Sequence, residues 1–173
     1  MKFLDYIYIF DDGITMETLR ILNKKETKEI LKMIKEQWDA DIELPYGVMR
    51  NNNDRIYLAN RDVFDLDLSK LKISSIGIYF GEIIKDKEMR KDRDMRLSIE
   101  GSQIVGPYAK ENVVELSDEE AKDWLRGNDA DRKVENRGFI IIKSGSDYLG
   151  SGKSMGGKIL NYVPKGRRIT SSD

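Results

Sequence analysis

The sequence predicts an α+β protein, in which an N-terminal α/β part (residues 1–109) packs on a small C-terminal β-barrel (residues 110–173). Three observations support this fold class. In the first part, a helix with one apolar face lies between strands rich in β-branched and aromatic residues. The second part holds short strands separated by glycine-rich turns, a pattern typical of small barrels. Between them, Gly106-Pro107 ends a short helix and marks the boundary.

The N-terminal part is predicted to contain one long helix between short strands. Asn23 and Glu26 have the spacing of a capping box, so a helix is expected to begin there and to end near Trp38. Its apolar residues recur at helical spacing on one face: Ile30, Leu31, Ile34 and Trp38. The other expected elements are strands at residues 6–10, 55–59, 74–84 and 95–99, an irregular segment or strand at 41–49, a turn at 51–54, a helix or loop at 66–73, and a short helix at 100–105.

The C-terminal part is predicted to place one helix among short strands. Ser117 and Glu120 form a second capping box, and Gly127 suits the position just after the helix that they begin. Strands are expected at residues 113–116, 138–143, 148–154 and 158–163, with the last two joined by Gly156-Gly157. We interpret the acidic residues of this helix as stabilising it through the helix dipole, and not as a catalytic or metal-binding pair. They are Asp118, Glu119, Glu120 and Asp123.

Composition excludes several kinds of chemistry. The chain has no cysteine and no histidine, so disulfides, thiolate nucleophiles, cysteine-bound zinc and histidine-based triads cannot occur. Composition leaves enzymes built on carboxylates or lysine open. We expect no catalytic residue, no metal and no cofactor. No apolar run approaches the ~20 residues that cross a bilayer, and the first ten residues lack a basic leader. The expected location is the cytoplasm, without membrane contact.

Charge is unevenly distributed, although the net charge is only −1. Residues 1–78 carry a net charge of −2, residues 79–131 carry −5, and residues 132–173 carry +6. A stretch without any acidic residue contains the basic side chains Lys153, Lys158, Lys165, Arg167 and Arg168. Such a patch attracts polyanions locally, and the same pattern also occurs in solvated tails. Tyr148 and Tyr162 would offer stacking faces for exposed bases.

Two further segments can be interpreted either as structural elements or as binding elements. Residues 150–154, GSGKS, resemble the end of a phosphate-binding loop, but Asp147 stands where its first glycine is required. We therefore interpret Gly150 and Gly152 as glycines that let a strand bend or approach another backbone. In residues 86–96, basic side chains alternate with acids, which favours an exposed loop over a binding element. Arg96 opens the returning strand, and we include it among the predicted RNA-binding residues.

Four blocks in the N-terminal part resemble the Nip family of eukaryotic and archaeal ribosome-biogenesis proteins. They are NDRIY at residues 53–57, IGIYFG at 76–81, MRL at 95–97 and GPYAK at 106–110, in the same order as in that family. The resemblance implies a pre-PUA domain docked on a PUA pseudo-barrel, within large-subunit pre-rRNA processing.

The C-terminal part is similar to a PUA variant appended to NOL/NOP/Sun RNA cytosine methyltransferases. The matching blocks are LSDEEA at 116–121, WLRG at 124–127, YLGSGK at 148–153 and KILNYVPK at 158–165. We expect no methyltransferase activity from the chain itself, because it has no cysteine and no glycine-rich cofactor motif.

Together these resemblances imply an RNA-binding protein without catalytic activity that binds rRNA or tRNA, but not DNA, through a basic PUA face. The family pattern assigns RNA contact to Lys153 and Lys158, and the charge pattern with the methyltransferase-type ending adds Lys165, Arg167 and Arg168. An RNA methyltransferase or ribosome-assembly factors are the expected protein partners. Two alternatives stay open: an adaptor for an RNA-modifying enzyme with little RNA affinity of its own, and a nucleotide-dependent enzyme that uses Lys153.

Overall fold

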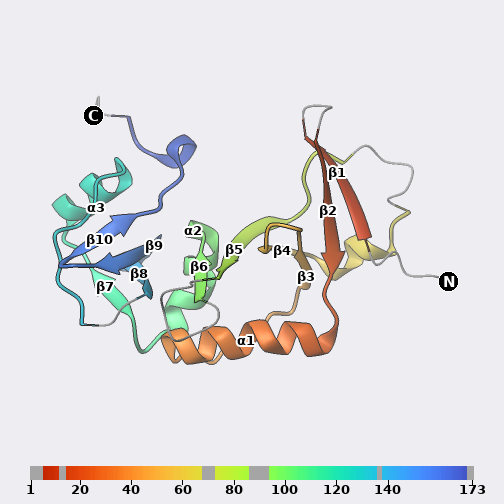
Figure 1. Ribbon diagram of the computed structural model, residues 1–173, viewed down its shortest axis with the longest axis horizontal. Helices are drawn as coiled ribbons and strands as arrows, with labels where there is room; N and C mark the ends of the chain where they lie inside the picture. Colours follow the sequence, from red (N-terminus) through yellow and green to blue (C-terminus); the bar gives the residue numbers. More distant parts are fainter. Residues whose placement is uncertain (1–5, 12–14, 68–72, 86–93, 136–137, 171–173) are drawn as a thin grey trace.

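The chain forms two sheets that pack against a shared core, as an α+β fold requires. The computed structural model describes residues 6–11, 15–67, 73–85, 94–135 and 138–170. In Figure 1 the hairpin of β1 (Tyr6–Asp11) and β2 (Thr15–Ile21) lies at one end of the molecule. The C-terminal sheet with α3 (Asp118–Leu125) lies at the other end, and α1 (Lys24–Trp38) runs along one side. The predicted fold class is confirmed.

The N-terminal sheet has six strands in the order in which they occur along the chain. All neighbouring strands are antiparallel. The connections differ in length: residues 51–54 make a short turn between two strands, whereas residues 22–46 contain a helix and residues 60–77 separate two further strands. The strands of this sheet are β1 (Tyr6–Asp11), β2 (Thr15–Ile21), β3 (Gly47–Arg50), β4 (Arg55–Ala59), β5 (Ile78–Ile84) and β6 (Asp94–Leu97).

Helix α1 (Lys24–Trp38) begins and packs as its sequence predicts. The Asn23 side chain accepts hydrogen bonds from the N–H groups of Lys25 and Glu26, and the Glu26 carboxylate accepts one from the Asn23 N–H, so the capping box is confirmed. The apolar face is also confirmed, because Ile30, Ile34 and Trp38 are buried. The helix ends at Asp39, whose backbone adopts the left-handed conformation.

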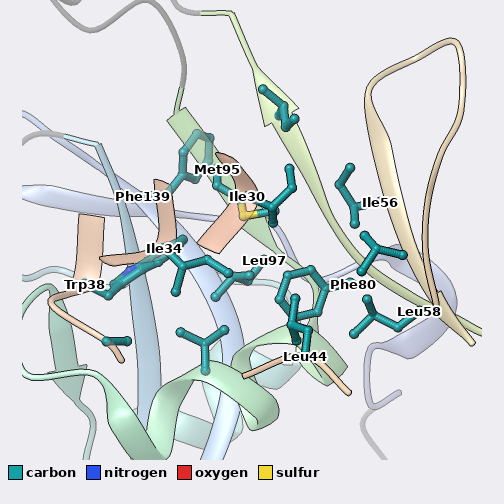
Figure 2. Close-up of a cluster of buried hydrophobic side chains, with 14 of the residues drawn as sticks. Ile30, Ile34, Trp38, Leu44, Ile56, Leu58, Phe80, Met95, Leu97 and Phe139 are labelled. Carbon is teal, nitrogen blue, oxygen red and sulfur yellow. The ribbon is translucent and has the colours of Figure 1, made fainter. Parts of the chain in front are cut away.

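The largest apolar cluster spans both halves of the chain. It joins α1 residues to Phe80 and Met95 of the N-terminal sheet and to Phe139 and Ile141 of β8 (Gly138–Ser144). Figure 2 shows Phe139 in the same cluster as Trp38 and Met95. The expected division between residues 109 and 110 stays a prediction, and the two halves share this core.

A buried polar side chain links the same elements. Gln37 on α1 donates from Nε2 to the carbonyl oxygens of Met95 (2.9 Å) and Phe139 (3.2 Å), and its Oε1 accepts from the Met95 N–H (2.9 Å). Since β6 is the outer strand of its sheet, Gln37 satisfies backbone groups that would otherwise be left unpaired at a buried edge. The amide thus holds α1, β6 and β8 in one arrangement.

The C-terminal sheet has four strands in the order β10-β9-β8-β7, in which β7 and β8 are parallel. Helix α3 (Asp118–Leu125) connects these two strands, as a parallel pair needs a crossover. Its capping box between Ser117 and Glu120 is confirmed, and Gly127 has the positive φ of +96° expected just after the helix. The remaining strands are β7 (Val113–Glu115), β9 (Asp147–Met155) and β10 (Lys158–Asn161).

Most predicted elements are present, with shifted ends. The predicted strand at 74–84 begins only at Ile78, and the one at 158–163 ends at Asn161. The short helix is α2 (Ile99–Val105), and a 3₁₀ turn (Gly106–Tyr108) continues from it through Pro107. Strand β2 was not predicted. Residues 86–93 of the expected charged loop, and 68–72 of the expected helix or loop, lie outside the described residues.

Candidate nucleic-acid interface

The GSGKS segment lies in the middle of strand β9, so it is not a phosphate-binding loop. The strand continues to Met155 and turns directly into β10, whereas a phosphate loop must precede a helix. Gly152 allows a close approach, because a Cβ at this position would lie 2.4 Å from the Ile159 side chain and 2.7 Å from that of Trp124. The interpretation of this glycine as a packing residue is confirmed.

Strand β9 is also hydrogen-bonded to elements that precede the C-terminal sheet. The Ser151 hydroxyl donates to the carbonyl oxygen of Leu97 at 2.7 Å, and the Gly150 N–H donates to the Ser102 hydroxyl at 3.0 Å. Both bonds are buried, and they connect β9 to β6 and α2. They position the C-terminal strands against the N-terminal sheet.

A groove of about 570 Å³ lies where these elements meet, and we call it the inter-sheet groove. Its walls come from β5, β6, α2, β9 and the segment that follows β10. The lining is mainly apolar and aromatic, with two arginines and one glutamate as its charged residues. Its side chains include Ile78, Tyr79, Arg96, Glu100, Tyr162 and Arg167.

Arg96 and Tyr162, two of the predicted RNA-binding residues, are in contact on one side of this groove. The Arg96 guanidinium lies 4.8 Å from the centre of the Tyr162 ring, within cation–π distance. It is also paired with Glu82 at 2.5 Å. The Tyr162 ring meets Phe139 in a T-shaped arrangement, with 5.5 Å between ring centres. Contacts from both sheets therefore fix the position of Tyr162.

The segment after β10 carries three more of the predicted residues. Arg167 pairs with Glu100 of α2 at 2.8 Å and lines the inter-sheet groove. The Arg168 side chain lies over Gly127 and donates from Nε to the carbonyl oxygen of Val163 at 3.0 Å. Lys165 is exposed, and no acidic side chain within the described ranges forms an ion pair with it.

The two lysines assigned by family resemblance have different surroundings. Lys153 is half-buried, and its Nζ lies 5.8 Å from the centre of the Phe139 ring. The ring near Lys153 is thus the one that meets Tyr162, and Lys153 itself does not line the inter-sheet groove. Lys158 is exposed at the start of β10 and lies 3.6 Å from Asp131. Acidic residues from the preceding segment thus offset part of the +6 charge that the sequence concentrates in the C-terminal part.

Tyr148 has a packing role. Its ring lies so close to Gly106 that a Cβ there would be 2.2 Å from it, and the side chain packs against the shared core. Stacking of a base on Tyr148 stays a prediction, whereas the ring's contact with Gly106 connects β9 to the end of α2.

Hydrogen bonds and burial alter the titration of two groups near these elements. Burial raises the pKa of the Tyr79 hydroxyl, which donates a hydrogen bond to Glu82. Hydrogen bonds from Arg132 and from Ser117 lower the pKa of Glu120 to about 2. The first group lines the inter-sheet groove, and the second belongs to the cap of α3.

The structure brings together part of the predicted site. Arg96, Tyr162 and Arg167 line one groove, whereas Lys153 is not among its lining residues. Lys158 and Arg168 are not among the lining residues. Sequence reasoning missed Ile78, Tyr79 and Glu100, since nothing in their local sequence separates them from ordinary strand and helix residues. Across the described ranges, acidic side chains form no group of three or more suited to a metal ion, and no helix is long and apolar enough to cross a bilayer.

Comparison with known proteins identifies the type of the C-terminal unit. Residues 111–169 match the family described as Methyltransferase RsmF PUA domain. Among curated proteins, the chain is similar to ribosomal RNA small subunit methyltransferase F of Shewanella oneidensis, with 27% identity over 73% of this chain and 25% of the relative. It is 28% identical to the Aeromonas salmonicida protein over 83% of this chain and 28% of the relative.

The similarity to these relatives is not confined to the C-terminal unit. Their aligned regions of 129 and 145 residues are longer than the segment 111–169, so they include part of the N-terminal half. The chain spans about a quarter of the length of the curated relatives that it matches. The C-terminal unit, which carries seven of the eight predicted RNA-binding residues, is similar to the PUA domain of these rRNA methyltransferases.

Proposed function

We propose that this chain is an RNA-binding protein without catalytic activity, which binds rRNA through the basic face of its PUA domain during RNA modification. One observation carries the proposal. Five basic residues between 153 and 168 lie within the PUA match, and no acidic residue interrupts them. Lysine and arginine provide the phosphate contacts that dominate RNA affinity.

The ion pairs on this face are compatible with RNA binding. Lys158–Asp131 and Arg167–Glu100 are exposed pairs, with side-chain exposures of 60% and 86% in the first and 56% and 32% in the second. Exposed pairs of this kind contribute about 0–1 kcal/mol, so exchanging the carboxylate for a phosphate costs little. Lys165 and Arg168 form no ion pair with another described residue, so a phosphate can bind them without breaking one.

A salt titration tests the proposal. Binding of the full chain to a fluorescently labelled single-stranded rRNA fragment is measured by anisotropy at several salt concentrations. If all five basic residues contact phosphates of single-stranded RNA, the logarithm of the affinity falls with the logarithm of salt with a slope of about −3.5. This amounts to roughly 100-fold weaker binding between 50 and 200 mM salt. Absence of binding at low salt refutes the proposal.

The noncatalytic part of the proposal has its own test. The chain lacks cysteine and histidine, so it has no residue for thiolate attack on cytosine. Incubation with an rRNA fragment and a labelled methyl donor is expected to transfer no label. Transfer above a protein-free control would contradict the proposal. The ribosome-assembly role implied by the Nip-type blocks, and a cytoplasmic location, stay predictions.

A second candidate function is an adaptor that joins an RNA-modifying enzyme and has little RNA affinity of its own. The observation that favours it is an apolar groove of about 1070 Å³ beside α1, lined by Leu22, Leu31, Leu44 and Phe64 among others. A complex with an RNA methyltransferase that persists after nuclease treatment, together with weak RNA binding in the salt titration, would support this function over the first.

A further inference from the structure

The inter-sheet groove has features that the basic PUA face alone does not explain. It lies between the N-terminal sheet and the C-terminal unit, and its volume of about 570 Å³ falls in the range of small-ligand sites. Two large apolar side chains on its walls, Ile78 and Tyr162, are 43% and 38% exposed. Exposed apolar surface within a concave site is typical of a place where a flat, partly apolar group binds.

Neighbouring side chains fix the position of the Tyr162 ring before any ligand binds. Arg96 lies against its ring, Glu82 fixes Arg96, and Phe139 meets the ring in a T-shaped contact. The ring therefore loses little conformational freedom when a base stacks on it, which favours binding. Aromatic side chains of this kind form the stacking surfaces of proteins that bind single-stranded nucleic acids.

Charge at the rim of the groove suits a phosphate. The lining contains two arginines and a single carboxylate, that of Glu100. Arg167 pairs with Glu100 at 2.8 Å, and the Arg167 side chain is 56% exposed. A guanidinium binds phosphate in a bidentate manner, so a phosphate can replace the carboxylate of Glu100 at Arg167.

We infer that the inter-sheet groove takes one unpaired nucleotide of RNA, with its base on Tyr162 and its phosphate on Arg167. This inference rests on the proposed function, and it adds that recognition depends on an unpaired base. A paired base within a duplex is stacked between its neighbours and cannot reach an aromatic ring in a groove. The protein should therefore prefer a hairpin loop to a blunt duplex of the same length.

Anisotropy titrations of the full chain with a labelled hairpin and a length-matched duplex test this inference. Tyr162→Leu should weaken hairpin binding about 5- to 150-fold, which is the effect of losing one stacked base. Duplex binding should not change, and Tyr162→Phe should keep hairpin affinity because the ring remains. Arg167→Gln should weaken hairpin binding, whereas Glu100→Gln should strengthen it about 2- to 5-fold by releasing Arg167.

The exposed pair of Lys32 and Glu36 on α1 supplies matched controls, because Lys32→Gln and Glu36→Gln make the same charge changes outside the groove. Both should leave the preference for the hairpin unchanged. If the unmodified chain binds neither RNA, the proposed function fails and the inference fails with it. If it binds both equally and Tyr162→Leu has no effect, the inference is overturned while the proposed function stands. If Tyr162→Leu unfolds the protein, the other variants decide: equal affinities of Glu100→Gln and Glu36→Gln for the hairpin overturn the inference.

Discussion

Replacing Gln37 with leucine should destabilise the whole protein, although the change makes a helix residue more apolar. The Gln37 side chain is buried and makes three hydrogen bonds to the backbone of Met95 and Phe139, in two different sheets. Leucine fills a similar volume but satisfies none of these groups. The backbone N–H of Met95 would be left without its partner in a buried environment.

The expected cost follows from these bonds. The Met95 N–H and the carbonyl oxygens of Met95 and Phe139 all lose their Gln37 partner. Each buried polar group left unsatisfied costs about 1–3 kcal/mol, and additional apolar burial by leucine offsets part of this sum. We expect a loss of about 3 kcal/mol in the free energy of unfolding, which lowers Tm by roughly 6–12 °C for a chain of this size. Urea unfolding followed by tryptophan fluorescence measures it, since Trp38 and Trp124 report on α1 and α3 respectively.

Gln103→Leu provides the control, because Gln103 lies on α2 and is exposed. Surface substitutions of this kind stay within about 0.5 kcal/mol. If Gln37→Leu unfolds at the same urea concentration as the unmodified chain, the reasoning about the buried amide is wrong. If the two tryptophans report separate transitions only in Gln37→Leu, the amide couples the two sheets as well as stabilising them.

Three more perturbations have defined outcomes. Gly152→Ala should lower the free energy of unfolding by about 1–3 kcal/mol, since its Cβ would overlap side chains in the core, and thermal unfolding measures it. Ionised Glu120 is stabilised by Arg132, which lowers its folded pKa to about 2 from an ordinary value of 4.5. The stabilisation that ionised Glu120 provides is therefore complete above pH 4.5 and is lost as the pH falls toward 2. The urea midpoint of Glu120→Gln should consequently vary less with pH across this range than the midpoint of the unmodified chain. Lys165→Gln should make the salt slope of RNA binding less steep by about 0.7 in an anisotropy titration.

Each of these has a contradicting result. Gly166→Ala adds a methyl group where no atom lies within 4 Å, so equal losses for Gly166→Ala and Gly152→Ala would exclude overpacking as the cause. A urea midpoint of Glu120→Gln that varies with pH as strongly as that of the unmodified chain would show that the pair with Arg132 does not govern this window. An unchanged salt slope for Lys165→Gln would remove Lys165 from the interface.

Local signals in the sequence predicted most of the secondary structure. The capping boxes at Asn23 and Ser117 begin helices where expected, because a cap depends only on residues three positions apart. The buried strand at Gly138–Ser144 was recognisable from its run of isoleucines. Strand β2 was missed because its pairing with β1 and β3, not its own composition, makes Thr15–Ile21 a strand.

The candidate site was predicted in part, for the same reason. Concentration of basic residues near the C-terminus is a property of the sequence, and it identified Arg167 and its neighbours. Which of these residues share a groove depends on contacts between distant segments. Arg96 reaches Tyr162 only because β6 and the segment after β10 lie side by side, and Glu100 meets Arg167 only because α2 packs against β9.

By itself, the sequence determined the α+β class, the helix caps, the amphipathic face of α1, the exclusion of cysteine and histidine chemistry, and the accumulation of positive charge in residues 132–173. These properties depend on composition or on neighbours within one turn or strand. Only the tertiary structure decided that Gln37 is a buried link between two sheets, that Tyr148 packs while Tyr162 is accessible, and that an apolar groove lies between the sheets. Burial and ion pairing are set by contacts between residues far apart in the chain, which local sequence patterns do not specify.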